Sequence, residues 1–266
     1  MLSNFHTHCV LCDGRDIPKD IVECAIRRGF SALGFSSHAY IDFDTSYCVK
    51  DEEEYIRQIN ALKKEYKGKI EIYTGAEEDA LCLTRRERFD YLIGSLHYVR
   101  SPRGILPLDL SEEGMRACLS AFDGNAIAMA EAYYKDFCAY IHTRRPDIVG
   151  HFDLITKYDE RGASHFLDDP CYNALAERYA ALAAEAGCVF EINTGAMARG
   201  LRTSPYPAAN LIHVLKKNGA RFIFSSDSHA KETLDFGFES AKALLREAGV
   251  KEAVTFKNGS FLSYEI

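Results

Sequence analysis

Seven short apolar runs recur along the chain, and longer amphipathic segments separate them. The runs are each of strand length, and they are Leu2–Phe5, Ala32–Phe35, Ile70–Tyr73, Tyr91–Ile93, Ile148–Val149, Val189–Ile192 and Phe222–Phe224. The segments between them show helical spacing of apolar residues, most clearly at 18–28, 51–66, 111–142, 169–186, 207–218 and 238–248. Strands that alternate with helices predict parallel βαβ units. We therefore expect an α/β fold.

The alternation continues along the whole sequence of 266 residues without a linker or a change in composition. We therefore expect residues 1–266 to form a single domain. A seven-stranded barrel-like fold is the favoured interpretation, and a doubly wound open sheet is the alternative. No stretch approaches the roughly 18 apolar residues that a membrane span needs, so no membrane association is expected.

Polar side chains follow each apolar run at the point where the strand should end. The motifs are His6-Thr7-His8, Ser36-Ser37-His38, Gly75-Ala76-Glu77, Gly94-Ser95-Leu96-His97, Gly150-His151-Phe152-Asp153, Glu191-Ile192-Asn193 and Ser226-Asp227-Ser228-His229. In a barrel, the carboxyl ends of the strands converge on one mouth, where active sites lie. Six of the nine histidines fall in these motifs, which predicts a metal site at that mouth.

The spacing within the motifs has a physical reason. Residues i and i+2 of a strand point to the same side, so His6 and His8 can hold one metal ion together, as can Asp227 and His229. Imidazole and carboxylate ligands suit zinc, iron or manganese. The nine candidate ligands are His6, His8, Asp13, His38, Glu77, His97, His151, Asp227 and His229. Nine ligands are too many for one ion, so we expect two or three divalent ions with a bridging carboxylate.

Two further carboxylates, Glu78 and Asp153, stand beside candidate ligands in the sequence. We prefer Glu77 to Glu78 as the ligand because Glu78 should point to the other side of its strand. We expect Asp153 to orient His151 rather than to bind metal, because metal-binding histidines commonly donate their second ring nitrogen to a carboxylate.

Charge and cysteine content restrict the partners and the compartment. The chain has 32 basic and 39 acidic residues, a net charge of −7, which is a poor match to long nucleic acid. Nine cysteines, an odd number, favour reduced thiols in the cytoplasm over a disulfide scaffold. The first residues lack a basic region followed by an apolar run, so we expect no signal peptide.

The order of these motifs resembles the PHP (polymerase and histidinol phosphatase) superfamily along nearly the whole chain. The text between the motifs is similar to the histidinol-phosphatase branch, and the segments that carry the likeness are NFHTHCVLCDG, DYLIGSLHYV, LDLS, DIVGHFDLITKY, FEINTGAMARGLRTSPYP and SSDSHA. The resemblance implies a distorted seven-stranded (β/α)7 barrel, similar to a TIM barrel. It also implies a trinuclear metal site at the carboxyl ends of the strands.

Carried over residue by residue, the resemblance implies three sets of ligands. The first metal would be held by His6, His8, Glu77 and Asp227, and Glu77 would bridge to a second metal that His97 and His151 complete. The third set would be Asp13, His38 and His229. The loop after Asn193 departs from the family, because its basic residues come late. The phosphate clamp is therefore expected to be Arg199, Arg202 or both.

The implied activity is hydrolysis of a phosphate monoester, L-histidinol phosphate, by a hydroxide that the metals activate. The expected partner is a small phosphorylated substrate, and the oligomeric state is left open. The alternative within the superfamily is a phosphoesterase acting on another small phosphate ester or a nucleotide. An amidohydrolase-type enzyme cutting C–N bonds and a non-catalytic metal-binding barrel are more distant alternatives. The arginine-bearing loop favours phosphate.

Overall fold

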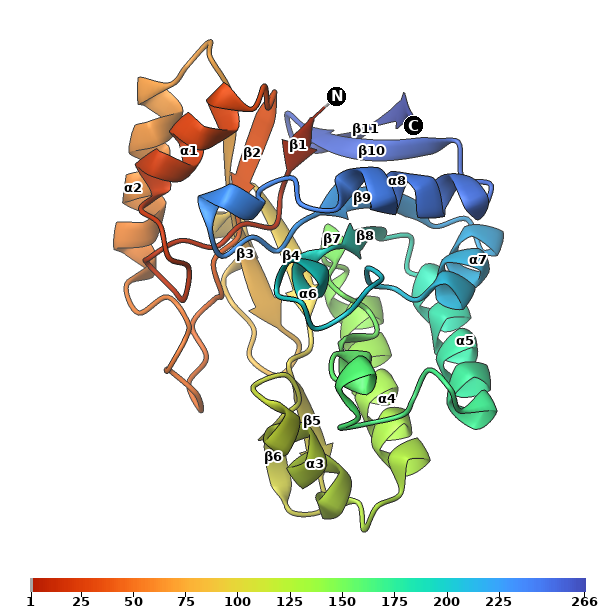
Figure 1. The fold of residues 1–266 in the computed structure, drawn as a ribbon. Coiled ribbons are helices and arrows are strands. Elements are labelled where there is room, and N and C mark those ends of the chain that lie inside the picture. Colours follow the sequence, from red (N-terminus) through yellow and green to blue (C-terminus); the bar gives the residue numbers. More distant parts are fainter. Residues whose placement is uncertain (1) are drawn as a thin grey trace.

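The computed structural model describes residues 2–266 (Figure 1). Seven parallel strands form one sheet in the order β1-β2-β3-β4-β7-β8-β9. Their bounds are β1 (Ser3–Asn4), β2 (Ala32–Phe35), β3 (Glu71–Asp79), β4 (Tyr91–Ser95), β7 (Ile148–Val149), β8 (Val189–Asn193) and β9 (Arg221–Ser225). All seven predicted strands are present, so the α/β assignment is confirmed.

The two edges of this sheet meet. The backbone N–H of His8 donates to the carbonyl oxygen of Ser228 at 2.8 Å, and the N–H of Ser228 donates to the carbonyl of His6 at 3.2 Å. These bonds join the end of β1 to the end of β9, which an open sheet would keep far apart. The molecule is therefore a nearly closed barrel, as the favoured interpretation predicted, and the doubly wound alternative is wrong.

Helices surround the barrel on the outside (Figure 1). They are α1 (Pro18–Arg27), α2 (Glu52–Glu65), α3 (Glu112–Ala121), α4 (Ala126–Arg144), α5 (Pro170–Ala184), α7 (Ala209–Lys217) and α8 (Phe238–Glu247), with a single turn α6 (Gly195–Ala198) after β8. The prediction of one helix over 111–142 is wrong. Asp123 and Gly124 have φ values of 53° and 79°, which end α3, and the Asn125 side chain then caps α4.

The sequence analysis did not predict two β-hairpins. One consists of β5 (Tyr98–Ser101) and β6 (Gly104–Pro107), and the other of β10 (Glu252–Lys257) and β11 (Ser260–Glu265). Phe256 of β10 packs against Phe5 and Tyr91 with ring centroids 6.0 and 5.6 Å apart, and joins a buried apolar cluster built from the barrel strands. The terminal hairpin therefore helps to fill the barrel from its amino-terminal end.

Within residues 2–266, no helix has both the length and the apolar character needed to cross a membrane.

Candidate metal centre

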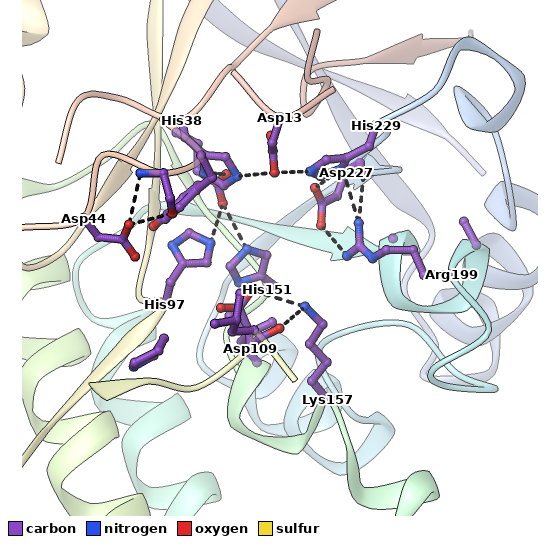
Figure 2. Close-up of a pocket in the computed structure, with 18 of the residues that line it drawn as sticks. Asp13, His38, Asp44, His97, Asp109, His151, Lys157, Arg199, Asp227 and His229 are labelled. Atoms are coloured by element: carbon purple, nitrogen blue, oxygen red, sulfur yellow. Dashed lines mark hydrogen bonds and ion pairs between the residues drawn. The ribbon is translucent and has the colours of Figure 1, made fainter. Parts of the chain in front are cut away.

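A cavity of about 670 Å³ opens at the carboxyl ends of the barrel strands. Its wall holds seven of the nine predicted ligands. They are Glu77 and the six labelled in Figure 2: Asp13, His38, His97, His151, Asp227 and His229. The other two, His6 and His8, lie directly behind it and have no exposed surface. The structure thus brings all nine residues together from strands that are spread over more than 220 positions of the sequence.

Four side-chain atoms converge in the first predicted set. Nε2 of His6 lies 3.3 Å from Oε2 of Glu77 and 3.7 Å from Oδ1 of Asp227. Nε2 of His8 lies 3.5 Å from the same Glu77 oxygen and 3.2 Å from the same Asp227 oxygen. In a tetrahedral site with metal–ligand bonds of about 2.1 Å, ligand atoms are about 3.4 Å apart. The spacing of His6, His8 and Glu77 therefore fits one metal ion, and Asp227 lies against both histidines.

The hydrogen bonding of this set supports the same interpretation. Nε2 of His6, Nε2 of His8 and Oε2 of Glu77 are buried and have no hydrogen-bond partner among the described residues. Buried polar atoms are nearly always hydrogen-bonded, so three unpaired atoms facing one another need an explanation. A shared cation supplies it, because each atom then donates a lone pair to the metal.

The second oxygen of Glu77 faces a different pair of histidines. Oε1 lies 3.0 Å from Nε2 of His151 and 3.3 Å from Nε2 of His97, and it accepts a hydrogen bond from the Ser95 hydroxyl at 2.7 Å. Since the two oxygens of one carboxylate face two sets of imidazoles, Glu77 has the geometry of a bridging ligand.

The third set lies nearest the solvent. Oδ2 of Asp13 lies 3.1 Å from Nε2 of His229 and 3.6 Å from Nε2 of His38. Nδ1 of His8 is 3.6 Å from the other Asp13 oxygen, so His8 presents one ring nitrogen to each of two sets. His38 is shared in a similar way, because its Nδ1 lies 2.8 Å from Oε2 of Glu77.

Glu77 and Glu78 point to opposite sides of β3, as the strand alternation predicted. Glu78 is fully buried on the outer side, where it pairs with Nε and Nη2 of Arg144 at 2.8 Å each and accepts from the Tyr140 hydroxyl at 2.8 Å. Asp79, two residues after Glu77, accepts from both the backbone N–H and Nδ1 of His97 at 2.8 and 3.1 Å. Asp79 therefore orients His97, a role that the sequence reasoning missed.

Glu191 on β8 is a second carboxylate with a missed role. One of its oxygens lies 2.9 Å from Nδ1 of His6, and the other accepts from the backbone N–H of His151 at 2.7 Å. This contact holds the His6 ring so that its Nε2 faces Glu77. Glu191 lies two residues before Asn193, the last residue of β8, so the two side chains point to the same side of the strand, and that position was the available signal.

The expectation that Asp153 orients His151 is wrong. Oδ2 of Asp153 accepts from the backbone N–H of Ala208 at 3.0 Å and lies 3.9 Å from Nη1 of Arg202, and neither oxygen bonds to His151. The reason is local. Strand β7 ends at Val149, and a 3-10 turn begins at Leu154, so strand alternation does not hold at these positions.

The two arginines of the loop after β8 are in different environments. Arg199 lines the cavity and donates from Nη2 to Oδ2 of Asp227 at 3.0 Å (Figure 2). The Arg202 side chain has no exposed surface, stacks over the Tyr206 ring at 4.3 Å and donates to the Thr156 hydroxyl. Of the two candidates for a phosphate clamp, Arg199 is therefore the one that faces the cavity.

The close approach of these buried carboxylates and imidazoles shifts their pKa values. Burial opposes ionisation of Glu77, but the charges of His6, His38 and His97 hold the pKa of that carboxyl well below its usual range. Burial, together with the charges of the neighbouring His229 and His38, lowers the pKa of His8 to about 3. Neutral imidazole and ionised carboxylate are the forms that bind metal.

Comparisons with known proteins bear on this site. A family model described as PHP domain matches residues 3–195, which is more than half of the chain. A probable histidinol-phosphatase of Schizosaccharomyces pombe is 26% identical over 96% of this chain and 89% of its own length. The histidinol-phosphatase of Bacillus subtilis is 27% identical over 88% of this chain and 96% of its own length.

A solved structure has the same fold. Histidinol phosphate phosphatase from Lactococcus lactis, crystallised in complex with zinc, L-histidinol and phosphate, matches 98% of this chain and 98% of its own with a TM-score of 0.69 and 21% identity. At this level of identity, the likeness supports the barrel architecture.

Proposed function

The chain belongs to the PHP-domain family, and from this premise we propose that it is a metal-dependent phosphatase that hydrolyses L-histidinol phosphate to L-histidinol and phosphate. The observation that carries the proposal is the convergence of His6, His8 and Glu77 at the spacing of a metal site, with Asp227 against both histidines and Arg199 on the same cavity. The relatives that match along most of the chain are named histidinol-phosphatases, which supports this substrate over other phosphate esters.

We propose that two or three divalent transition metal ions, such as zinc, iron or manganese, are bound here. His6, His8, Glu77 and Asp227 would hold the first, and Glu77, His97 and His151 the second. Asp13, His38 and His229 would hold the third. When bound, such ions supply Lewis acidity at the phosphoryl group and lower the pKa of water so that it can act as a nucleophile at neutral pH.

The residues around these ligands have their own tasks. Glu191 and Asp79 fix the ring orientations of His6 and His97. Arg199 binds the phosphate, since its planar guanidinium presents several donors and stays charged throughout the working pH range. Its ion pair with Asp227 holds it beside the metal ligands. A phosphate bound there is in contact with Arg199 and with the ligand groups at once.

The extent of the domain and its location complete the proposal. Residues 1–266 form a single domain, an inference that rests on the packing of β10 against the apolar cluster that the barrel strands build. We propose that the protein is cytoplasmic, which its nine free cysteines support, since a reducing compartment keeps thiols in this state.

Phosphate release by the metal-loaded protein tests the function. The substrates are L-histidinol phosphate, a nucleoside monophosphate, a sugar phosphate and an aryl phosphate. We expect the highest kcat/KM for L-histidinol phosphate, and loss of all activity after removal of metal with a chelator. A higher kcat/KM for another ester would contradict the proposed substrate, and full activity in demonstrably metal-free protein would contradict the metal dependence.

A further inference from the structure

Two carboxylates line the cavity without belonging to the proposed metal centre, and they differ in how their oxygens are used. Both oxygens of Asp44 are engaged: Oδ1 accepts from the Ser46 backbone at 3.1 Å and from its hydroxyl at 2.6 Å, and Oδ2 accepts from the Tyr98 hydroxyl at 2.9 Å. Asp109 uses only Oδ2, which lies 3.2 Å from Nζ of Lys157. Its Oδ1 receives no hydrogen bond from any residue in 2–266.

Asp109 is held firmly although one of its oxygens is free. Its backbone carbonyl accepts from Nζ of Lys157 at 2.8 Å and from the Tyr158 hydroxyl at 2.7 Å, so two side chains from the loop after β7 fix its position. Burial opposes its ionisation, but the charges of Lys157 and then His97 lower the pKa of the carboxyl. Asp109 therefore offers an anionic oxygen that is held in place and makes no hydrogen bond within residues 2–266.

The position of Asp109 within the cavity limits what this oxygen can bind. Figure 2 shows Asp109 and Lys157 beside His151, with Asp13 at the far side of the ligand cluster. The backbone N–H of Leu108, the residue before Asp109, donates to the carbonyl oxygen of His97 at 2.9 Å, and Asp109, His97 and His151 line the same cavity, so Asp109 lies on the side of the second set of metal ligands. Asp109 and Arg199 line the same cavity as the metal ligands, so a substrate whose phosphate lies on those ligands and Arg199 has its organic part in the space that Asp109 borders.

L-Histidinol phosphate carries an ammonium group on the carbon next to the ester methylene. That group remains within a few bonds of the phosphate whatever conformation the imidazole arm takes. Its binding partner must therefore lie beside the metal ligands rather than at the outer rim of the cavity. We propose that Asp109 binds the substrate ammonium through Oδ1 and so selects amino-bearing phosphate esters, an inference that rests on the proposed function.

The test compares two esters that differ only in the amino group: L-histidinol phosphate and 3-(imidazol-4-yl)propyl phosphate. Asp109→Asn keeps the shape of the side chain and an acceptor for Lys157 but removes the charge. We expect kcat/KM for L-histidinol phosphate to fall about 10- to 100-fold, the effect of losing one charge-assisted hydrogen bond, and kcat/KM for the other ester to change little. Asp44→Asn is the matched control, and its ratio between the two esters should stay at the wild-type value.

A binding measurement separates recognition from turnover. In titration calorimetry with phosphate present, Asp109→Asn should weaken binding of L-histidinol but not of 3-(imidazol-4-yl)propan-1-ol. Equal losses of kcat/KM on both esters in Asp109→Asn would overturn the proposal. The same holds if Asp109→Asn leaves kcat/KM unchanged for 2-aminopropyl phosphate, which carries the amino group but no imidazole. Failure of the wild-type enzyme to hydrolyse L-histidinol phosphate while it cleaves other esters would instead overturn the proposed function.

Discussion

Glu77 makes more contacts with the candidate ligands than its neighbours on β3. Its two oxygens lie within 3.5 Å of nitrogens from His6, His8, His38, His97 and His151. Glu78, the next residue, has the same charge and the same burial but contacts Arg144 on the outer side of the strand. Variants of Glu77 should therefore affect the metal centre, and variants of Glu78 should affect the stability of the barrel.

We expect Glu77→Gln to lower both metal content and phosphatase activity by orders of magnitude, because an amide is a poor bridging ligand. Glu78→Gln should retain the metal but lower the free energy of unfolding by about 1–3 kcal/mol, since Arg144 loses its charged partner. Elemental analysis, phosphate release and thermal unfolding of both variants provide the measurement. The reverse ranking in metal content would show that the register of β3 is displaced by one residue.

Arg199 and Arg202 allow a second comparison between neighbouring residues. Arg199→Ala should reduce kcat/KM about 10- to 100-fold by removing a charge-assisted contact to the phosphate, with the metal content unchanged. Arg202→Ala should act mainly on stability, because Asp153 is then left as a buried carboxylate without its cation. Steady-state kinetics and metal analysis distinguish the two. Near-normal kcat/KM in Arg199→Ala, or loss of metal from it, would contradict a role in phosphate binding.

At the scale of secondary structure, the strands deliver ligands and the partners of those ligands from the same ends. Strand β3 supplies Glu77 together with Asp79, and β8 supplies Glu191. Each of these two additional carboxylates contacts a histidine from another strand, at 3.1 Å for Asp79 and 2.9 Å for Glu191. Carboxylates on one strand therefore orient histidines that follow another strand before any metal binds.

This arrangement predicts that Glu191→Gln weakens metal binding about 10- to 100-fold, because the His6 ring loses its anionic partner. The readout is competition with a chromophoric chelator, which does not depend on turnover. Asp153→Asn is the control: this carboxylate is equally buried but bonds to Ala208 instead of a ligand histidine. Its metal affinity should match the wild type. Equal affinity in Glu191→Gln would exclude the positioning role.

The whole molecule couples metal binding to protonation. Burial opposes protonation of His38, but Glu77 and Asp13 raise its pKa to about 9. Burial acts in the same sense on His6 and His97, yet Glu191 raises the pKa of His6 and Glu77 raises that of His97, each well above the ordinary value. Without metal, the folded chain thus keeps protons that an unfolded chain releases near pH 6.5.

The metal-free protein should therefore be stabilised by these histidines below pH 6.5 and lose that contribution as the pH rises towards 9. His8, whose pKa is lowered to about 3, adds no pH dependence above 6.5. We expect the Tm of chelator-treated protein to fall by on the order of 5 °C across this interval, while metal-loaded protein falls less, because metal replaces the protons. Thermal unfolding of both forms from pH 6 to 9 measures this. Parallel curves would contradict the coupling.

Local pattern in the sequence was sufficient for the seven barrel strands, for the convergence of the nine candidate ligands and for the orientation of Glu77, rather than Glu78, towards the cavity. It did not predict the two hairpins. The physical reason is that strand alternation and apolar runs are properties of consecutive residues, and that parallel strands bring their carboxyl ends to one side. The barrel strands could therefore be predicted from patterns among residues that are neighbours in the chain.

Tertiary structure decided which polar groups meet across distant segments. Asp109 and Lys157, 48 residues apart, pair in the cavity wall, and His6 and Glu191, 185 residues apart, share a hydrogen bond. Arg199 faces the cavity and Arg202 does not, although both stand on the same short loop. The energy of such a contact depends on distance and burial in three dimensions, and spacing along the chain carries neither quantity for segments this far apart.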